Sequence, residues 1–382
     1  MSYALGNVSP GDTVMLADGT YPGPFSMTTR SGTSGHYITI RATNPGMAKL
    51  VVSGQYSALN LKDVSWIRIE GLDCQAAQDH GIQSENSHHI QVVGNTCHNC
   101  GGSGIALNFG DYYLVETNTV FNNCATNTYQ TSGISIYQAR AISGSASGFH
   151  IYIRRNMIYG NLESASIGIA HTEGNGIIID DAHNSQSQPG SSTAGNYSGS
   201  MLIENNLVTN NGGDGILVYE SDNVTVRHNT VAFNNTDTLN SGTWRGELAN
   251  SQGRNNHWYN NIAVCNTATN VNRNALLDGV TGGFQNTGTA WIGNLLFDTN
   301  APARSAVLIG GASNQYTSAM ALTNNPLRSD PKFALTPTGG NAGSFRLLSG
   351  SPAINAAQTI YANTVDYFNA TRSLPDVGAI EA

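Results

Sequence analysis

Short stretches of apolar residues recur along the chain, each centred on an asparagine and often closed by a second one. The stretches read VVGNTCHNC, VETNTVFNN, IRRNMIYGN, IENNLVTNN, VRHNTVAFNN, WYNNIAVCN and WIGNLLFD. Their aligned asparagines are Asn95, Asn118, Asn156, Asn206, Asn229, Asn261 and Asn294. The shortest spacing between them is 23 residues, and the longer spacings fit the same step with insertions. A period in the low twenties predicts a β-solenoid, in which each coil stacks on the one before it.

A second repeated feature, a glycine followed by an isoleucine, begins an apolar strand in several coils. It occurs at Gly81-Ile82, Gly104-Ile105, Gly133-Ile134, Gly176-Ile177 and Gly215-Ile216. Strands of neighbouring coils are expected to pair about 4.8 Å apart, so equivalent positions form columns along the stack. We expect the repeated asparagines to be structural, each bonded to the amides of the coils above and below.

The composition favours one long all-β domain. Charged residues make up 11% of the chain, which contains 43 glycines and few of the residues that form helices. We predict a single domain over 1–382, a single-stranded β-helix of roughly ten coils with long loop insertions. Its expected parts are N-terminal coils and cap at 1–55, central coils at 56–300, and C-terminal coils and cap at 301–382.

The net charge limits the kinds of binding partner that we expect, and the cysteine spacing bears on metal binding. The formal net charge of -8 argues against nucleic acid or an anionic membrane as a partner. No apolar run is long enough for a membrane span, and the N-terminus lacks a signal-peptide pattern. Cys97 and Cys100 form a CxxC, but each lies about one coil from another cysteine, Cys74 or Cys124. We therefore expect stacked, buried side chains rather than a metal site, with disulfides left open.

Several longer motifs resemble a known family. The opening VSPGDTVMLADGTY, SGTSGHYITIRA and NPGMAKLVVSG resembles the N-terminal coils of pectate-lyase-like and alginate-lyase-like proteins. The closing FRLLSGSPAINAA, VDYFNATR and LPDVGAIE is similar to the C-terminal edge of many bacterial β-helix proteins. HTEGNGIIIDD at 171–181, GGDGI at 212–216 and TWRGEL at 243–248 resemble secreted bacterial relatives. The resemblance implies a right-handed parallel β-helix, an extracellular location and action on carbohydrate.

Polar residues gather next to the glycine-isoleucine strands. Aligning Gly246 with Gly215 places Arg245 in one column with Asn175 and Asp214. The full column before each glycine reads His80, Ser103, Ser132, Asn175, Asp214 and Arg245. Because charge is sparse elsewhere, this cluster is the main candidate for chemistry.

The adjacent pair Asp180-Asp181 ends an unusually apolar strand. Paired carboxylates suit a hard cation, with Asp214, Glu173 or backbone carbonyls completing the site, and the resemblance points to Ca²⁺. The alternative is a turn held by bonds from the aspartate to the backbone.

The remaining candidates surround this pair. The resemblance implies a base at Arg245, although arginine is a poor base because its pKa exceeds about 12. The other catalytic candidates are Asp181, Asp214, Glu247 and His171, and the candidates for substrate binding are Trp244, Glu220, Tyr219, Tyr137 and Arg227. A further column, Glu116, Arg154, Glu204 and Arg227, alternates in sign and favours cross-strand ion pairs.

The resulting hypothesis is a polysaccharide lyase that cleaves an acidic, uronate-containing glycan by metal-assisted β-elimination. One departure is that none of the three lysines, Lys49, Lys62 and Lys332, falls near the cluster, whereas related lyases use a lysine base. The alternatives are a glycoside hydrolase using two carboxylates, a uronate epimerase, and a non-catalytic glycan-binding or adhesion solenoid. A monomer or loose oligomer is expected.

Overall fold

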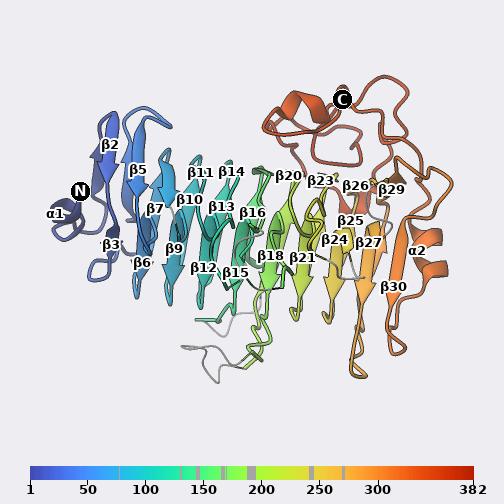
Figure 1. The fold of residues 1–382 in the computed structure, drawn as a ribbon, viewed down its shortest axis with the longest axis horizontal. Helices are drawn as coiled ribbons and strands as arrows, with labels where there is room; N and C mark the ends of the chain where they lie inside the picture. Colours follow the sequence, from blue (N-terminus) through green and yellow to red (C-terminus); the bar gives the residue numbers. More distant parts are fainter. Residues whose placement is uncertain are drawn as a thin grey trace.

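A computed structural model describes residues 1–76, 78–129, 131–142, 147–164, 168, 170–186, 195–240, 245–268 and 272–382. Within these residues, thirty strands form three parallel sheets of ten strands each, wound as a β-helix (Figure 1). This confirms the predicted fold and the number of coils. No helix of the described chain is long and apolar enough to cross a membrane.

Each coil contributes one strand to each of three sheets, here named A, B and C. Sheet A contains β1 Thr13–Leu16, β4 Ile38–Ala42, β7 Ser65–Glu70, β10 His88–Val93, β13 Asp111–Glu116, β16 Phe149–Arg154, β19 Ser200–Glu204, β22 Val224–Arg227, β25 His257–Tyr259 and β28 Ala290–Ile292. Sheet B contains β2 Gly19–Pro22, β5 Ala48–Val52, β8 Asp73–Ala76, β11 Thr96–His98, β14 Thr119–Phe121, β17 Met157–Tyr159, β20 Leu207–Thr209, β23 Thr230–Ala232, β26 Ile262–Cys265 and β29 Leu295–Asp298. Sheet C contains β3 Phe25–Met27, β6 Leu59–Lys62, β9 Ile82–Glu85, β12 Ile105–Asn108, β15 Ile134–Tyr137, β18 Ile177–Asp180, β21 Ile216–Tyr219, β24 Arg245–Ser251, β27 Arg273–Gly279 and β30 Val307–Gly310.

The interior is a stack of apolar side chains that alternate with outward-facing ones along each strand. The isoleucines of the repeated glycine-isoleucine feature pair in register and are fully buried: Ile82, Ile105, Ile134, Ile177 and Ile216. Burying one such side chain is worth roughly 1.5–3 kcal/mol, so this column alone contributes substantially to the core.

The predicted asparagine ladder lies at the turn from sheet A to sheet B. In each step the side-chain oxygen of one asparagine accepts bonds from the backbone and side-chain N–H groups of the previous one, as between Asn156 and Asn206 at 3.0 and 2.9 Å. The ladder runs through all seven predicted asparagines and ends on Asn325. Buried polar groups are thereby satisfied along the whole turn, which confirms the structural interpretation.

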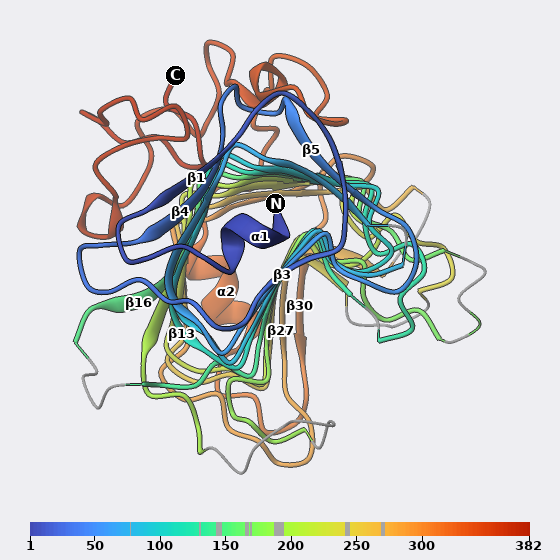
Figure 2. The same ribbon diagram turned by 90° about the vertical axis from the view of Figure 1, so that its left-hand side faces the viewer.

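The two ends of the solenoid are covered by short helices. The helix α1 Ser2–Leu5 lies across the first coil in the view down the axis (Figure 2), and α2 Ser318–Asn324 packs against β28 and β30. These helices cover sheet edges that would otherwise expose apolar surface and unpaired backbone.

The segment after α2 lies outside the three sheets. It contains two short 3₁₀ helices, Ala342–Phe345 and Thr359–Tyr361, and folds over the outer side of sheet B (Figure 1). Phe345, Ala353 and Val377 pack there on outward residues of that sheet. Arg372 donates to Glu381 at 2.7 Å and to the carbonyl of Gly378 at 2.8 Å, so its guanidinium group stabilises this segment.

The cysteines and the column of alternating charges lie where the sequence predicted them. The five cysteines are buried and free. The column of alternating charges forms cross-strand ion pairs on sheet A, Glu116 with Arg154 at 2.7 Å and Glu204 with Arg227 at 2.9 Å. Both expectations, buried stacking and ion pairing, are confirmed.

Candidate functional site

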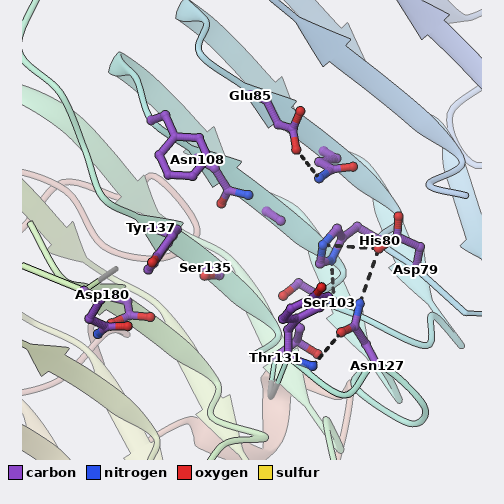
Figure 3. A pocket seen from close by; sticks show the side chains of 15 residues that line it. Asp79, His80, Glu85, Ser103, Asn108, Asn127, Thr131, Ser135, Tyr137 and Asp180 are labelled. Atoms are coloured by element: carbon purple, nitrogen blue, oxygen red, sulfur yellow. Dashed lines mark hydrogen bonds and ion pairs between the residues drawn. The ribbon is translucent and has the colours of Figure 1, made fainter. Parts of the chain in front are cut away.

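A groove runs along the outward face of sheet C. It consists of two adjoining cavities of about 400 and about 620 Å³, both lined by Tyr129, Asp180 and Gln186. The first extends toward β9, and its lining is drawn in Figure 3. The second extends over β21 and β24 toward Leu277 on β27. A long open groove on a rigid scaffold suits a chain-like ligand better than a compact one.

The floor of the groove is formed by the last outward-facing residue of successive sheet C strands. The register gives the column Glu85, Asn108, Tyr137, Asp180, Tyr219 and Ser251. Neighbours in this column are about 4.8 Å apart because they sit on adjacent strands. Asp180 therefore lies between two phenols, those of Tyr137 and Tyr219.

The electrostatics of the floor centre on Asp180. Burial, followed by the nearby charge of Asp181, raises the pKa of the Asp180 carboxyl to about 7, although Gln186 donates to it at 3.2 Å. Burial also raises the pKa of Tyr219 to about 12. The Tyr137 hydroxyl is buried and has no hydrogen-bond partner among the described residues. A carboxyl that titrates near neutral pH beside two phenols can both accept and return protons.

One wall of the groove carries Asp214 and Arg245. Both are buried, and Arg245 leaves its Nε atom without a hydrogen-bond partner within the described part of the chain. Burial raises the pKa of Asp214 to about 6, while the Arg245 guanidinium and the Gly246 N–H, which donates at 2.9 Å, counteract this shift. The arginine thus brings a permanent positive charge to the wall.

Glu173 stands beside this wall in a polar network. It accepts bonds from the Ser132 hydroxyl at 2.6 Å and the Asn175 amide at 2.9 Å. The Asn175 side-chain oxygen in turn accepts the backbone N–H of Asp214 at 2.7 Å. Burial raises the pKa of Glu173, with a further contribution from Asp180. The predicted column before each glycine is therefore real for Ser132, Asn175 and Asp214.

The predicted alignment of Gly246 with Gly215 is wrong by one residue. Ile216 pairs with Leu248, so Glu247 takes the glycine position and Gly246 lies beside Asp214. The long strand β24 includes residues before the usual start, and a loop of variable length hides this shift in the sequence. Arg245 still reaches the groove, from one position further along the wall.

Asp181 does not line the groove with Asp180. Its fully buried carboxylate accepts bonds from the Gln138 amide at 2.7 Å and from the Ser185 and Gln186 backbone N–H groups at 2.8 Å. Its φ of 48° shows that the chain turns there, which points the second acid of the pair into the loop. The alternative interpretation from the sequence, a turn held by an aspartate, describes Asp181.

Glu247 also lies away from the groove, at the end of a second asparagine ladder. This ladder runs through Asn123, Asn161, Asn211 and Asn234 at the turn after sheet B. Glu247 accepts both the backbone N–H of Asn234, at 3.1 Å, and its side-chain amide, at 2.6 Å. It is fully buried, and burial raises its pKa to about 8. The structure gives Glu247 a structural place instead of the predicted catalytic one.

Replacing Glu247 with glutamine tests this placement. The folded protein holds the Glu247 proton up to about pH 8, whereas the unfolded chain releases it near 4.5, so the wild type loses stability as pH rises from 4.5 through 8. Each pKa unit corresponds to ~1.4 kcal/mol. We expect Glu247→Gln to be more stable than wild type by a few kcal/mol in urea unfolding at about pH 9, and close to it at about pH 5. The control Glu70→Gln, on the surface of sheet A, should show no such divergence. A variant that is less stable at both pH values would contradict the ladder role.

The remaining predicted residues are divided between the groove and other places. Glu220 follows β21, where it accepts bonds from Ser185 and Gln252 beside the groove. Arg227 lies on sheet A, paired with Glu204, and is not brought to the groove. His171 is buried against Asp237, its Nδ1 lying 2.5 Å from an Asp237 oxygen. Trp244 lies outside the described residues.

The first part of the groove contains several residues that the sequence patterns did not identify. His80 and Ser103 belong to the predicted column, but the cavity shows them beside Asp79, Asn127 and Thr131 (Figure 3). The Ser103 N–H donates to His80 Nδ1 at 2.9 Å, and His80 Nε2 lies 3.3 Å from Asp79. Burial lowers the His80 pKa, which favours a neutral ring that donates to Asp79. Glu85 and Asn108 could have been predicted to line the groove, because they occupy the same strand position as Asp180.

The predicted calcium site stays a prediction, because the described residues bring its four carboxylates only partly together. The Asp181 carboxylate accepts hydrogen bonds from the backbone of its own loop. Asp180, Asp214 and Glu173 each accept hydrogen bonds from neutral donors. Among the described residues, the only three ligand-type side chains whose atoms lie within 4.8 Å of one another are Glu163, His171 and Asp237. The groove carboxylates therefore form no ready-made chelate, and no step is assigned to calcium.

Comparison with known proteins finds the same kind of fold. Residues 25–158 match the family model "Right handed beta helix region". The crystal structure of pectate lyase Pel9A is similar, with a TM-score of 0.51 and 17% identity over 100% of this chain and 90% of that one. A mannuronic acid specific polysaccharide family 6 lyase from human gut microbiota has a TM-score of 0.44 and 18% identity, covering 86% of this chain and 68% of that one. A PL6 alginate lyase in complex with a trisaccharide has a TM-score of 0.44 and 12% identity, covering 97% and 91%. No curated protein matches the chain. The fold is thus a right-handed parallel β-helix.

Proposed function

We propose that this protein is a polysaccharide lyase that cleaves a uronate-containing glycan in the sheet C groove. The observation that carries the proposal is the position of Asp180 on the floor, between Tyr137 and Tyr219 and in the same cavity as Arg245. The groove provides a base, candidate proton donors and a fixed positive charge within one open channel. The fold is shared with a protein named as a pectate lyase, which agrees with the proposal.

Each group has a defined part in β-elimination. Arg245 pairs with the uronate carboxylate, which makes the neighbouring C–H more acidic. Ionised Asp180 removes the proton from C5, the electron pair forms the C4=C5 bond, and the bond from C4 to the glycosidic oxygen breaks. A phenol, that of Tyr219 or Tyr137, donates a proton to the departing oxygen. The products are an unsaturated uronate and a new reducing end.

This assignment replaces the base predicted from the resemblance. Arginine side chains are poor general bases because their pKa ordinarily exceeds about 12. Asp180, by contrast, has a pKa of about 7, the value that serves a general base best near neutral pH. Arg245 therefore acts in the proposal as the partner of the substrate carboxylate.

A second candidate, a glycoside hydrolase, is favoured by one specific observation. Asp180 and Asp214 line the same cavity, and burial raises both their pKa values, to about 7 and about 6. A protonated carboxyl and an ionised one are the pair that glycosidic hydrolysis requires. The more acidic of the two would then be the nucleophile or base.

Product analysis separates the two chemistries. The purified protein is incubated with polyuronates and with neutral glycans, with added Ca²⁺ and after removal of metal by a chelator. Ultraviolet absorbance that grows with the C4=C5 bond, on polyuronates only, is the expected result. New reducing ends without that absorbance would establish the hydrolase instead. Activity that requires Ca²⁺ would show that substrate completes a cation site which the groove carboxylates do not form alone.

A further inference from the structure

The loops beside the groove contain a buried cluster that the proposed reaction does not use. Glu163 follows β17, His171 lies in the same connection just before β18, and Asp237 lies between β23 and β24. All three residues are buried, with 2%, 7% and 7% of their surfaces exposed. One nitrogen of His171 and one oxygen of each acid lie within 4.8 Å of one another.

The hydrogen bonds within this cluster leave one ligand atom free. His171 Nδ1 and Asp237 Oδ2 share a bond of 2.5 Å, and the other Asp237 oxygen accepts the Leu239 N–H at 2.8 Å. Glu163 Oε2 accepts the Glu173 N–H at 3.4 Å. Glu163 Oε1, however, is buried and has no hydrogen-bond partner among the described residues. Leaving such an atom unsatisfied costs about 1–3 kcal/mol, and more for a charged group.

The charges in the cluster are also unbalanced. Two carboxyl groups share this buried space with a single imidazole. A divalent cation would satisfy both the free oxygen and the excess negative charge.

We infer that Glu163, His171 and Asp237 form a binding site for a zinc-like transition-metal ion. One imidazole nitrogen and two carboxylate oxygens are ligands that Zn²⁺ accepts, with a fourth position open to water. A calcium ion prefers six to eight oxygen ligands, so this set does not suit it. Metal binding would replace the proton between His171 and Asp237, and the two atoms would separate from 2.5 Å to about 3.3 Å in a tetrahedral site.

The position of the cluster gives the ion a structural consequence. Thr172 and Glu173 follow His171 directly and line the groove. An ion that joins Asp237 to the connection before β18 would fix this wall with respect to the next-but-one coil. The inference does not depend on the reaction proposed for the groove.

Metal retention and spectroscopy test the site without any activity assay. The full-length protein is stripped with chelator, reloaded with Zn²⁺ or Co²⁺, passed through gel filtration and analysed for metal content. We expect one ion per chain, visible d–d absorption of the Co²⁺ form typical of low coordination, and a higher unfolding temperature with Zn²⁺. The variant His171→Ala should bind Zn²⁺ at least tenfold more weakly.

Two further variants make the test decisive. Glu163→Gln keeps the size of the side chain and should also weaken binding, which covers the case in which His171→Ala does not fold. His183→Ala is the matched control, because His183 lies 2.9 Å from Asp222 but belongs to no three-ligand group among the described residues. It should retain the ion. Failure of the wild type to retain Zn²⁺, or equal retention by Glu163→Gln and the wild type, would overturn the site.

Discussion

Asp180→Asn is expected to lower kcat/KM on the cleaved glycan by about 10²–10⁴-fold, the usual contribution of a positioned general base. The amide keeps the shape of the carboxyl and can still bond to Gln186, but it cannot accept the C5 proton. Because Asp180 lies on the outward side of sheet C and not in the interior, the fold should be unaffected. Initial rates from the absorbance of the unsaturated product, with circular dichroism as a check on folding, measure this effect.

A matched control is available on another face of the solenoid. Asp73 is also a strand aspartate, on β8 of sheet B, where it lies 3.1 Å from His98. Asp73→Asn should leave the rate unchanged, so a loss in both variants would point to a general effect on the fold. Equal activity of Asp180→Asn and the wild type would remove Asp180 from the mechanism.

The pH profile provides an independent check on the same residue. The base must be ionised, and the Asp180 pKa of about 7 is set by burial, the Asp181 and Glu220 charges and the bond from Gln186. The wild-type rate should therefore rise as pH increases through about 7. This limb should be absent from the residual activity of the asparagine variant.

Asn156→Ala should cause a large loss of stability. Asn156 donates to Val115 and Asn206 and accepts two bonds from Asn118, all at 2.9 to 3.0 Å and all buried. Alanine leaves several of these partners without a bond, and each buried orphan costs about 1–3 kcal/mol. A loss of several kcal/mol is expected in urea unfolding followed by circular dichroism.

The control for this prediction is an asparagine on the surface. Asn44 is exposed and donates only to Asp18, at 3.0 Å. Asn44→Ala should change the free energy of unfolding by no more than about 0.5 kcal/mol. A similar small change in Asn156→Ala would show that the ladder contributes little to stability.

The fold could be predicted because its signals repeat. Asn206 and Ile177 each have counterparts at the same position in neighbouring coils. One repeated pattern therefore predicts the stacking of the coils, the column of core residues and the turn between sheets A and B. The C-terminal segment of the chain has no such repeat. Residues 326–382, which pack on sheet B, follow no period, so their path could not be predicted from the repeat.

The site could be predicted only where the register held. Asp180, Asp214 and Tyr219 were brought to one groove because strand pairing determines their columns, and Arg245 reaches the groove despite a shift of one residue. Asp181 and Glu247 failed for local reasons, a left-handed turn and a shift of one residue after a long loop. The cluster of Glu163, His171 and Asp237 depends on where irregular loops cross, which periodicity does not describe.

A crystal structure of Asp180→Asn soaked with an oligouronate tests the central claim most directly. We predict sugar density along the outward face of sheet C, with a uronate carboxylate against Arg245 and C5 facing residue 180. Sugar bound on sheet A, or on the C-terminal segment over sheet B, with the sheet C groove empty, would contradict the account.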